Sequence, residues 1–216
     1  MIRKFSYITD LGEIVSINNA HKETREHETA LESTEIGNLI HFSRSYAITN
    51  HNISSAIENG YFSEPNLVRQ LQLHFAHIYF ENLNSYAANL RMPRRWLKAG
   101  AQRRFGFLSS EISLLLAVRA HILCDAPLAL RRLNTEPSVF ASDYFRIQKV
   151  LVSSSREIIT TLNPGNSDLE MRFKKTLVVP ASAAIFIWRL KAWYDYTKAQ
   201  GLYFCIKGFT AQRQST

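Results

Sequence analysis

The apolar stretch from about Phe107 to Leu133 constrains the fold of this chain more than any other feature. It is too long for a strand, and wound as a helix it is hydrophobic on nearly every side. A helix of that kind belongs in the interior of a protein, because no face of it is suited to water. The sequence therefore predicts a buried central helix around which the rest of the chain packs.

Two polar residues, His121 and Asp125, stand inside this stretch, in LLLAVRAHILCDAPLAL. They are four residues apart, so they lie on one face of the helix. A buried carboxylate is costly unless it is hydrogen-bonded, paired or bound to a metal. Pro127 has no N–H and leaves the carbonyl of Leu123 without its helical donor, which predicts a loosened helix beside the pair. The pair is interpreted either as a structural hydrogen bond or as a functional site.

Helical periodicity also dominates the remaining sequence, and no run of alternating strand residues is present. We expect further helices over about 34–59, 63–91, 142–162 and 167–200. Gly60 and Gly201 are expected to end two of them, Ser63 to cap one, and Pro180 to break or kink the last. The prediction is a single all-α bundle over 34–200, with a polar N-terminal arm at 1–33 and a C-terminal tail at 201–216.

The positive charge of the chain is unevenly distributed. The formal net charge is +8, and no acidic residue occurs between Glu81 and Glu111. That interval holds a basic segment, here called the 91–104 segment, with the cations Arg91, Arg94, Arg95, Lys98, Arg103 and Arg104. It predicts either a solvated connection or a surface that attracts anions. For nucleic acid we expect only weak, nonspecific binding that fades by physiological salt.

The compartment is expected to be the cytoplasm. The N-terminal sequence has no apolar signal-peptide core, and the two cysteines form no disulfide framework. The longest apolar run extends only from Thr176 to Trp188 and holds Pro180, so we expect no membrane span. A homo-oligomer is left open by the sequence.

Three sets of candidate site residues follow. The catalytic set is His121 as acid/base, Asp125 as its orienting partner and Arg119 as an anchor for an anionic group. If a divalent metal is bound, its ligands are expected to be His121, Asp125, His74 and Asp143. A substrate pocket is expected beside His74, Tyr79 and Trp188, with further aromatic candidates Tyr86, Tyr194 and Tyr196. Asp143 also has a simpler interpretation, as a cap at the start of the fourth helix.

Motifs for nucleotide binding, zinc-peptidase chemistry and serine-hydrolase chemistry are absent from the sequence: there is no P-loop, no dinucleotide glycine fingerprint, no HExxH and no GxSxG. No cofactor is favoured, and a divalent metal remains the alternative.

Several short motifs point to a known family. They are RAHILCDAPLAL at 119–130, NGYF at 59–62, FAHIYF at 75–80, PRRW at 93–96 and SDY at 142–144. Over about residues 36–200 the chain resembles the bacterial and fungal helical proteins of domain-of-unknown-function family 5995. The central helix of that family reads Asn-Ala-His-Ile-Asn-x-Asp-Leu-Pro-x-Ala-Leu. Arg119 and Leu123 replace its two asparagines, and Gln72 stands at an acidic position of its second helix. The resemblance implies a helical fold and no particular activity.

A more distant similarity is to helical zinc phospholipases and nucleases, which also place a His and an Asp four residues apart as metal ligands. Their further histidine after a proline is missing beyond Pro127.

Three functions remain open. The first is an enzyme acting on a small organic molecule, for example in specialised-metabolite biosynthesis, with the His121–Asp125 pair as acid/base. The second is a metal-dependent hydrolase that uses the same pair as ligands. The third is a non-enzymatic protein that binds phosphate, nucleic acid or another protein through the 91–104 segment.

Overall fold

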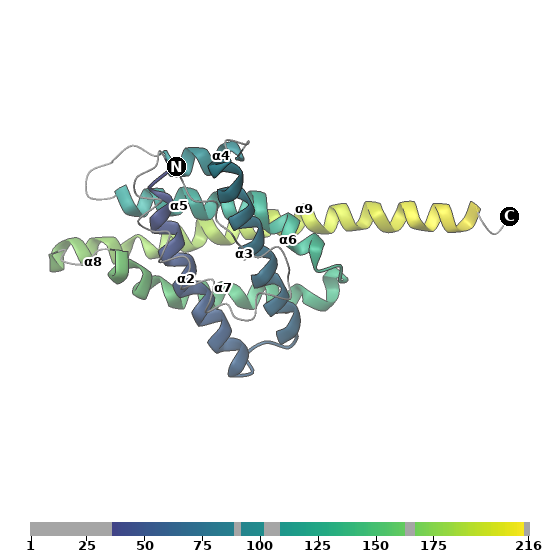
Figure 1. Ribbon diagram of the computed structural model, residues 1–216. Helices are drawn as coiled ribbons and strands as arrows, with labels where there is room; N and C mark the ends of the chain where they lie inside the picture. The colour runs from purple at the N-terminus through teal and green to yellow at the C-terminus, as the bar shows by residue number, and fades with distance from the viewer. Residues whose placement is uncertain (1–35, 89–91, 102–108, 163–166, 214–216) are drawn as a thin grey trace.

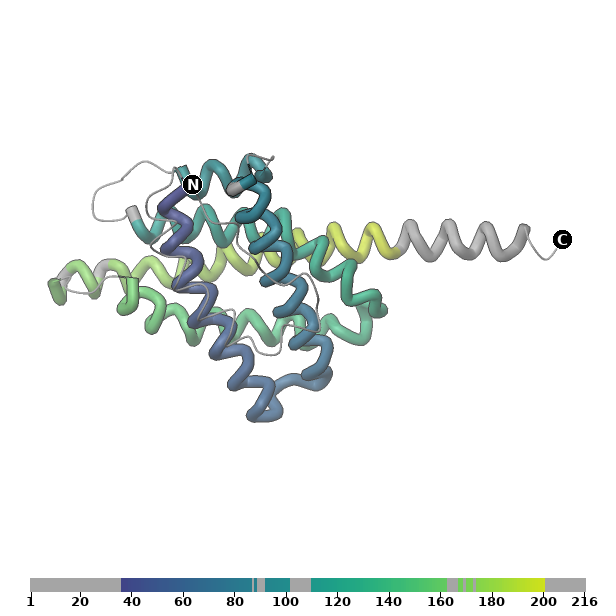
Figure 2. Tube along the Cα trace, viewed as in Figure 1, coloured from purple at the N-terminus to yellow at the C-terminus, as the bar shows by residue number. Residues whose placement is uncertain are grey.

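The computed structural model of the chain describes residues 36–88, 92–101, 109–162 and 167–213, and these ranges contain helices and no strand. The predicted all-α class is therefore confirmed. Helices α2 (Leu39–Glu58) and α3 (Pro65–Ala87) lie side by side and cross over α5 (Ser109–Ala120) and α7 (Pro137–Leu162), as Figures 1 and 2 show. The predicted arm at 1–33 lies outside the described residues.

The central helix is present, but it changes its winding at the polar pair. Helix α5 leads directly into a π-helical segment, η2 (His121–Asp125), which leads into α6 (Ala126–Arg132). The backbone N–H of Ala126 donates to the carbonyl of His121, five residues earlier. This wider turn stands where the sequence predicted loosening by Pro127, whose missing N–H prevents an ordinary helical bond at that point.

Burial of the central helix is less complete than the sequence suggested. Leu128 is 47% exposed, and Leu114 and Leu115 are half-buried and line a cavity. Some sides of this apolar helix pack against other helices, and another side forms part of the wall of a cavity.

Helix α2 ends as predicted at Gly60. This residue has a φ of +69°, a left-handed conformation that glycine adopts without strain. The N–H of Gly60 donates to the carbonyl of Ile57, and that of Tyr61 donates to Ala56, so the helix closes with a Schellman motif.

The start of α3 differs from the prediction. Glu64, not Ser63, is the N-cap, and no side chain of the helix itself caps it. The carboxylate of Asp143 accepts hydrogen bonds from the backbone N–H groups of Ser63 (3.1 Å) and Glu64 (2.5 Å) instead. Helix α7 begins at Pro137, so Asp143 lies in its second turn and does not cap its own helix. Asp143 was expected to cap the helix that contains it. It caps α3 instead, because α3 and α7 meet at this point.

The C-terminal region contains two helices. Helix α8 (Asp168–Thr176) begins with a capping box between Ser167 and Glu170. Helix α9 (Val178–Arg213) begins just before Pro180, which occupies its first turn, where a proline costs little. The predicted break therefore falls before Pro180 and not at it. Helix α9 continues past Gly201, so the predicted end at that residue is wrong.

Two helical stretches, Ser110–Arg132 and Glu170–Gln200, are long and apolar enough to cross a membrane by length and composition alone. This is weak evidence, because the core helix of a soluble protein passes the same test. The first stretch is 44% buried within the protein and the second 11%. The expectation of no membrane span stays a prediction.

A short helix, α4 (Arg94–Gly100), packs against α5 and brings Trp96 into the core with no exposed surface. Its last residue, Gly100, passes the chain just before α2 at close range. A Cβ at position 100 would lie 2.6 Å from the Cβ of Ile36 and 2.9 Å from its Cα. The side chain of Asn38 adds a hydrogen bond to the carbonyl of Gly100 at 3.2 Å. Only glycine permits this contact.

We predict that Gly100→Ala destabilises the protein by about 1–3 kcal/mol, because the added methyl group pushes backbone against backbone in a packed region. Urea denaturation followed by circular dichroism measures the loss. Ala101→Gly, a change of similar size at the exposed neighbouring position, is the control and should shift stability much less. An unchanged midpoint for Gly100→Ala would contradict the close contact.

Candidate functional site

The carboxylate of Asp125 is the polar centre of the interior. It is 1% exposed and accepts hydrogen bonds from three side chains on different elements. Nδ1 of His121 lies 2.9 Å from Oδ2, Nε1 of Trp96 lies 3.2–3.3 Å from both oxygens, and Nδ2 of Asn82 lies 3.3 Å from Oδ1. These donors come from η2, α4 and α3. A buried carboxylate is tolerated here because its oxygens are well supplied with donors.

Aromatic rings surround the imidazole of His121. The ring centroids of Phe75, Phe42 and Tyr46 lie 4.4, 5.1 and 5.1 Å from that of His121. Trp96 and Tyr79 stand further out, at 5.9 and 6.4 Å. The rings fix the imidazole plane and exclude water from it.

The second ring nitrogen of His121 is unsatisfied. Nε2 is buried and has no hydrogen-bond partner among the described residues. A buried polar atom without a partner is rare, because it forfeits its bonds to water. Asp125 thus binds the imidazole of His121 through Nδ1, and Nε2 is left without a partner in the described part of the chain.

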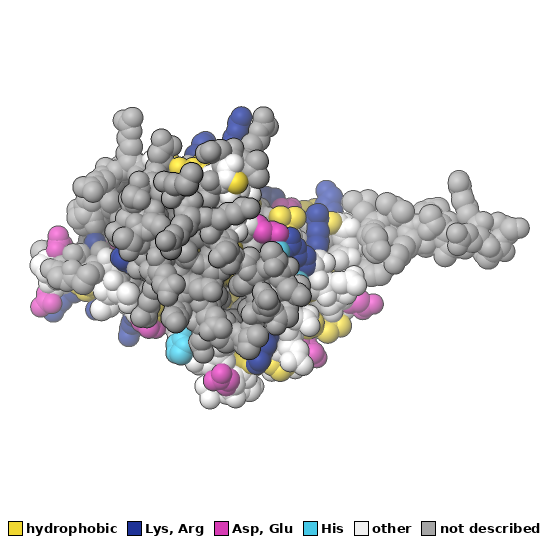
Figure 3. All heavy atoms as spheres, in the orientation of Figure 1, with side chains coloured by type: hydrophobic (Ala, Val, Ile, Leu, Met, Phe, Trp, Pro, Cys, Tyr) yellow, Lys and Arg dark blue, Asp and Glu magenta, His cyan; other side chains and the backbone are white. Residues whose placement is uncertain are grey.

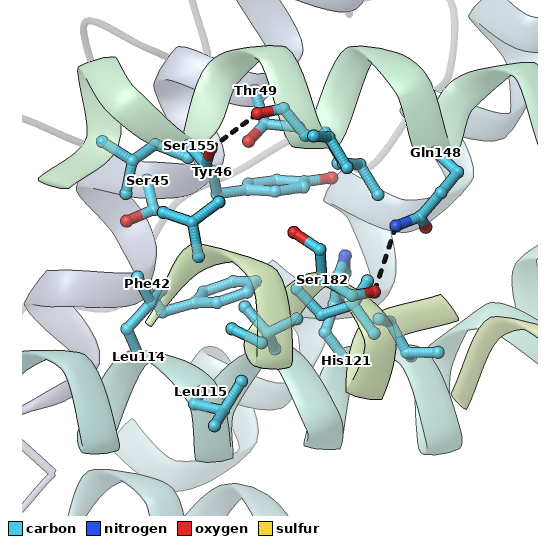
Figure 4. A pocket seen from close by; sticks show the side chains of 18 of the residues that line it. Phe42, Ser45, Tyr46, Thr49, Leu114, Leu115, His121, Gln148, Ser155 and Ser182 are labelled. Carbon is cyan, nitrogen blue, oxygen red and sulfur yellow. Dashed lines mark hydrogen bonds between the residues drawn. The ribbon is translucent and has the colours of Figure 1, made fainter. Parts of the chain in front are cut away.

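A large cavity, partly open to solvent beside Val152, lies against this site. Its volume is about 520 Å³, in the range typical of small-molecule sites. Its walls come from α2, α3, α5, η2, α7, the α8–α9 junction and the start of α9. Figure 4 shows Phe42 and Tyr46 of α2, Leu114 and Leu115 of α5, and His121 around it. Most lining side chains are aliphatic or aromatic, so the cavity suits an apolar molecule.

A few polar groups line the same cavity. The Tyr46 hydroxyl is buried without a well-formed hydrogen bond to any described residue, although the Asn50 side chain is close enough to affect it. Burial is the largest cause that raises the pKa of the Tyr46 phenol, and the Asn50 side chain offsets it only in part. Gln148 donates to the carbonyl of Ser182 at 3.3 Å, and its Oε1 is buried with no partner in the described part of the chain.

Charged groups of the lining lie at separate places. Lys174 of α8, 2% exposed, forms an ion pair of 3.0 Å with Glu111 of α5. Arg189 of α9 is 5% exposed, and no described carboxylate lies within ion-pair distance of it. Burial lowers the pKa of the Arg189 guanidinium, and the nearby Tyr144 partly opposes that shift.

The structure places the predicted catalytic residues differently. His121 and Asp125 are hydrogen-bonded and buried as a pair. Arg119, the predicted anion anchor, is exposed, stacks over the Trp188 ring at 5.9 Å and is not part of the cavity lining. Trp188 lies outside the lining as well. Neither residue lines the cavity, so the roles expected of Arg119 and Trp188 stay predictions.

Tyr79 and His74, also predicted at the pocket, do not line it. The Tyr79 hydroxyl pairs with Oγ of Ser43 at 2.6 Å, and its ring belongs to the second layer around His121. His74 is half-buried on α3; burial, followed by the charge of Arg132, lowers its pKa. The further candidates Tyr86, Tyr194 and Tyr196 are absent from the lining too.

The predicted metal-ligand set is not assembled. Asp143 caps α3, and within the described ranges no group of three His, Cys, Asp or Glu side chains is arranged to hold a metal ion. His121 and Asp125 remain together as a pair only, since neither His74 nor Asp143 joins them.

The 91–104 segment is described only in part. Residues 92–101 form α4 and its flanks, and Arg103 and Arg104 lie outside the described residues. On the face drawn in Figure 3, the coloured Lys and Arg side chains stand at several separate places with acidic side chains among them. The hypothesis of a nucleic-acid surface stays a prediction.

Comparison with known proteins gives one match. A family model described as "Family of unknown function (DUF5995)" matches residues 18–203. The chain belongs to this family. No curated protein and no solved structure gives a significant match. The resemblance to DUF5995 that was inferred from the central-helix motif is confirmed. The family has no assigned activity.

Sequence reasoning missed several residues that build the site in this DUF5995 protein. In the sequence, Phe42, Tyr46 and Phe75 have the pattern of ordinary core positions, and Asn82 carries no signal that marks it as a partner of Asp125. The Pro-x-x-Trp motif at 93–96 did contain a signal, because a tryptophan N–H that is buried needs an acceptor. Arg189 stands within the apolar sequence IFIWRLKAW, where a cation is as conspicuous as Asp125 is in the central helix.

We predict that Trp96 and Asp125 are energetically coupled by about 1–3 kcal/mol, the value of a hydrogen bond to a charged group. A double-mutant cycle with Trp96→Phe, Asp125→Ala and the combined variant measures this in chemical denaturation. The cycle cancels the packing that each substitution removes by itself. Free energies of unfolding that add to within about 0.5 kcal/mol would argue against the bond.

Proposed function

We propose that this protein is an enzyme that transfers a proton to or from an apolar small molecule held in the cavity beside His121, with His121 as the general acid/base. The observation that carries the proposal is the buried, unpartnered Nε2 of His121 beside a cavity of about 520 Å³. The family has no assigned activity, so the proposal rests on the chemistry of this site.

The hydrogen bond to Asp125 determines what His121 can do. A carboxylate that takes bonds from Trp96, Asn82 and His121 acts as an acceptor, so Nδ1 of the imidazole carries the hydrogen. In the neutral ring, Nε2 then bears a lone pair. That atom can remove a proton from a bound molecule, and the resulting imidazolium is stabilised by the adjacent carboxylate.

Tyr46 supplies a complementary group. Its ring lies 5.1 Å from that of His121, and the raised pKa of its phenol keeps it protonated. A neutral phenol donates a hydrogen bond and is suited to stabilise an oxygen that gains negative charge as His121 takes a proton. The aromatic enclosure strengthens both interactions because it lowers the local dielectric constant.

Access to Nε2 requires movement of a side chain, because the atom is shielded from water in this conformation. Phe75, Phe42 and Tyr46 are the rings that both pack around the imidazole and line the cavity. A ligand that fills the cavity is expected to displace one of these rings and complete the site.

The test uses a reaction that reports a general base in an apolar site. In 5-nitrobenzisoxazole a base removes the carbon-bound proton, the electron pair forms the nitrile, and the N–O bond breaks to give a coloured phenolate. We expect the protein to catalyse this elimination, and His121→Gln to lower the rate by at least about 10²-fold. Asp125→Asn should also lower it, because the imidazole loses its orienting acceptor.

His74→Gln is the matched control, since it removes a half-buried histidine that does not line the cavity, and its rate should equal that of the unmodified protein. His121→Gln is expected to keep a melting temperature near that of the parent. If the probe binds in the cavity but His121→Gln reacts as fast as the parent, the acid/base role is wrong. Any acceleration that remains would come from a group other than His121, and no acceleration by the parent protein would overturn the proposal as well.

A further inference from the structure

The charge of Arg189 is unusual for its surroundings. The side chain is 5% exposed, lines the cavity and has no carboxylate partner among the described residues. A guanidinium stays charged in proteins, so burial does not remove the problem by deprotonation. A buried charge is normally paired, because its transfer out of water is expensive.

The neighbours of Arg189 hold it in place without neutralising it. One terminal nitrogen donates to the carbonyl of Tyr144, and the guanidinium stacks over the Tyr144 ring at 4.1 Å from its centroid. The Tyr144 hydroxyl in turn donates to the carbonyl of Arg189 at 3.0 Å. Nε is buried with no acceptor in the described part of the chain. The arginine is thus oriented and keeps unused donor capacity.

Among the described residues that line the cavity, cations outnumber anions by one. Its described charged lining residues are Glu111, Lys174 and Arg189. The first two pair with each other at 3.0 Å. Two cations and one anion leave a net charge of +1, which is located at Arg189. A ligand with one negative charge complements this lining, and a neutral ligand does not.

Arg189 and His121 belong to the same end of the cavity. Ala192, one turn after Arg189, packs against Ile122, the residue after His121. The Lys174–Glu111 pair is at the other end, since Glu111 stands ten residues before His121, about 15 Å along a helix. The wall between these ends includes Leu114, Leu115 and Val118 of the same helix.

We infer that the cavity binds an elongated apolar molecule with a single carboxylate, and that Arg189 is the counter-ion of this carboxylate. The head of the molecule then lies at the His121 end, and its apolar tail extends towards the Lys174–Glu111 pair. This inference names the ligand class for the proposed function, and binding can be measured without any turnover.

The experiment compares cis-parinaric acid, a fluorescent fatty acid, with its uncharged methyl ester at pH 7. We expect the parent protein to bind the acid at least about tenfold more tightly than the ester, because a charge-assisted bond is formed only by the acid. Arg189→Met should weaken binding of the acid to the level of the ester and leave the ester unchanged. Arg189→Lys should keep part of the preference for the acid.

Arg119→Met is the matched control. Arg119 also stacks on an aromatic ring, but it is exposed and outside the cavity lining, so its removal should not alter the affinity for either probe. The preference of the parent protein tests the inference even if Arg189→Met fails to fold.

Equal binding of acid and ester, or no binding of either probe, would overturn the inference. So would an Arg189→Met variant that folds and still prefers the acid. His121→Gln removes a wall residue but leaves Arg189 in place, so it should keep the preference for the acid over the ester; loss of elimination activity with intact acid preference separates this inference from the proposed proton transfer.

Discussion

The hydrogen bonds to the Asp125 carboxylate join three parts of the chain that are distant in sequence. Asn82 on α3, Trp96 on α4 and His121 on η2 all donate to the same two oxygens. Removal of any one donor leaves the others attached to a carboxylate that is less well satisfied in a site without water. Position, orientation and charge of the site therefore depend on the packing of α4 against the bundle, which in turn needs the glycine at position 100. The fold and the candidate chemistry share these contacts.

The π-helical segment has a function in this arrangement. In a regular helix, the amide of residue 127 would bond to the carbonyl of Leu123, but proline has no N–H to give. The helix instead accommodates a wider turn at His121–Asp125, where the N–H of Ala126 reaches back to His121. Such turns are rare and often occur at functional sites, because they alter the directions of side chains within an otherwise rigid helix. Here the histidine keeps its bond to Asp125 and still belongs to the cavity wall.

The sequence allowed prediction of the helical class, the central helix and the polar pair, because periodicity and an isolated carboxylate in an apolar run are local signals. It did not allow prediction of which other residues surround the pair. Phe42, Tyr46 and Phe75 look like ordinary core positions, and only the crossing of α2 and α3 over the central helix brings them to His121. Arg119 and Asp143 were misplaced for the same reason. A charged residue in an apolar stretch of sequence indicates that it needs a partner. The sequence does not show which residue of another helix that partner is.

The unsatisfied polar groups that line the cavity are best understood together with the cavity, and not as separate packing defects. Core cavities made by truncating side chains destabilise a protein by about 24 cal/mol per Å³. The apolar walls of this pocket of about 520 Å³ lack the same packing contacts, and because Val152 in the wall is 41% exposed, the space is also open to solvent. Water relieves this cost poorly where the walls are aliphatic, because it finds few partners there. Several of the buried unpartnered atoms belong to residues that line this same space, namely Tyr46, Gln72, His121, Gln148 and Arg189, whereas those of His74 and Asn84 lie elsewhere. A single occupant that is apolar along most of its length and polar at one end would relieve both costs at once.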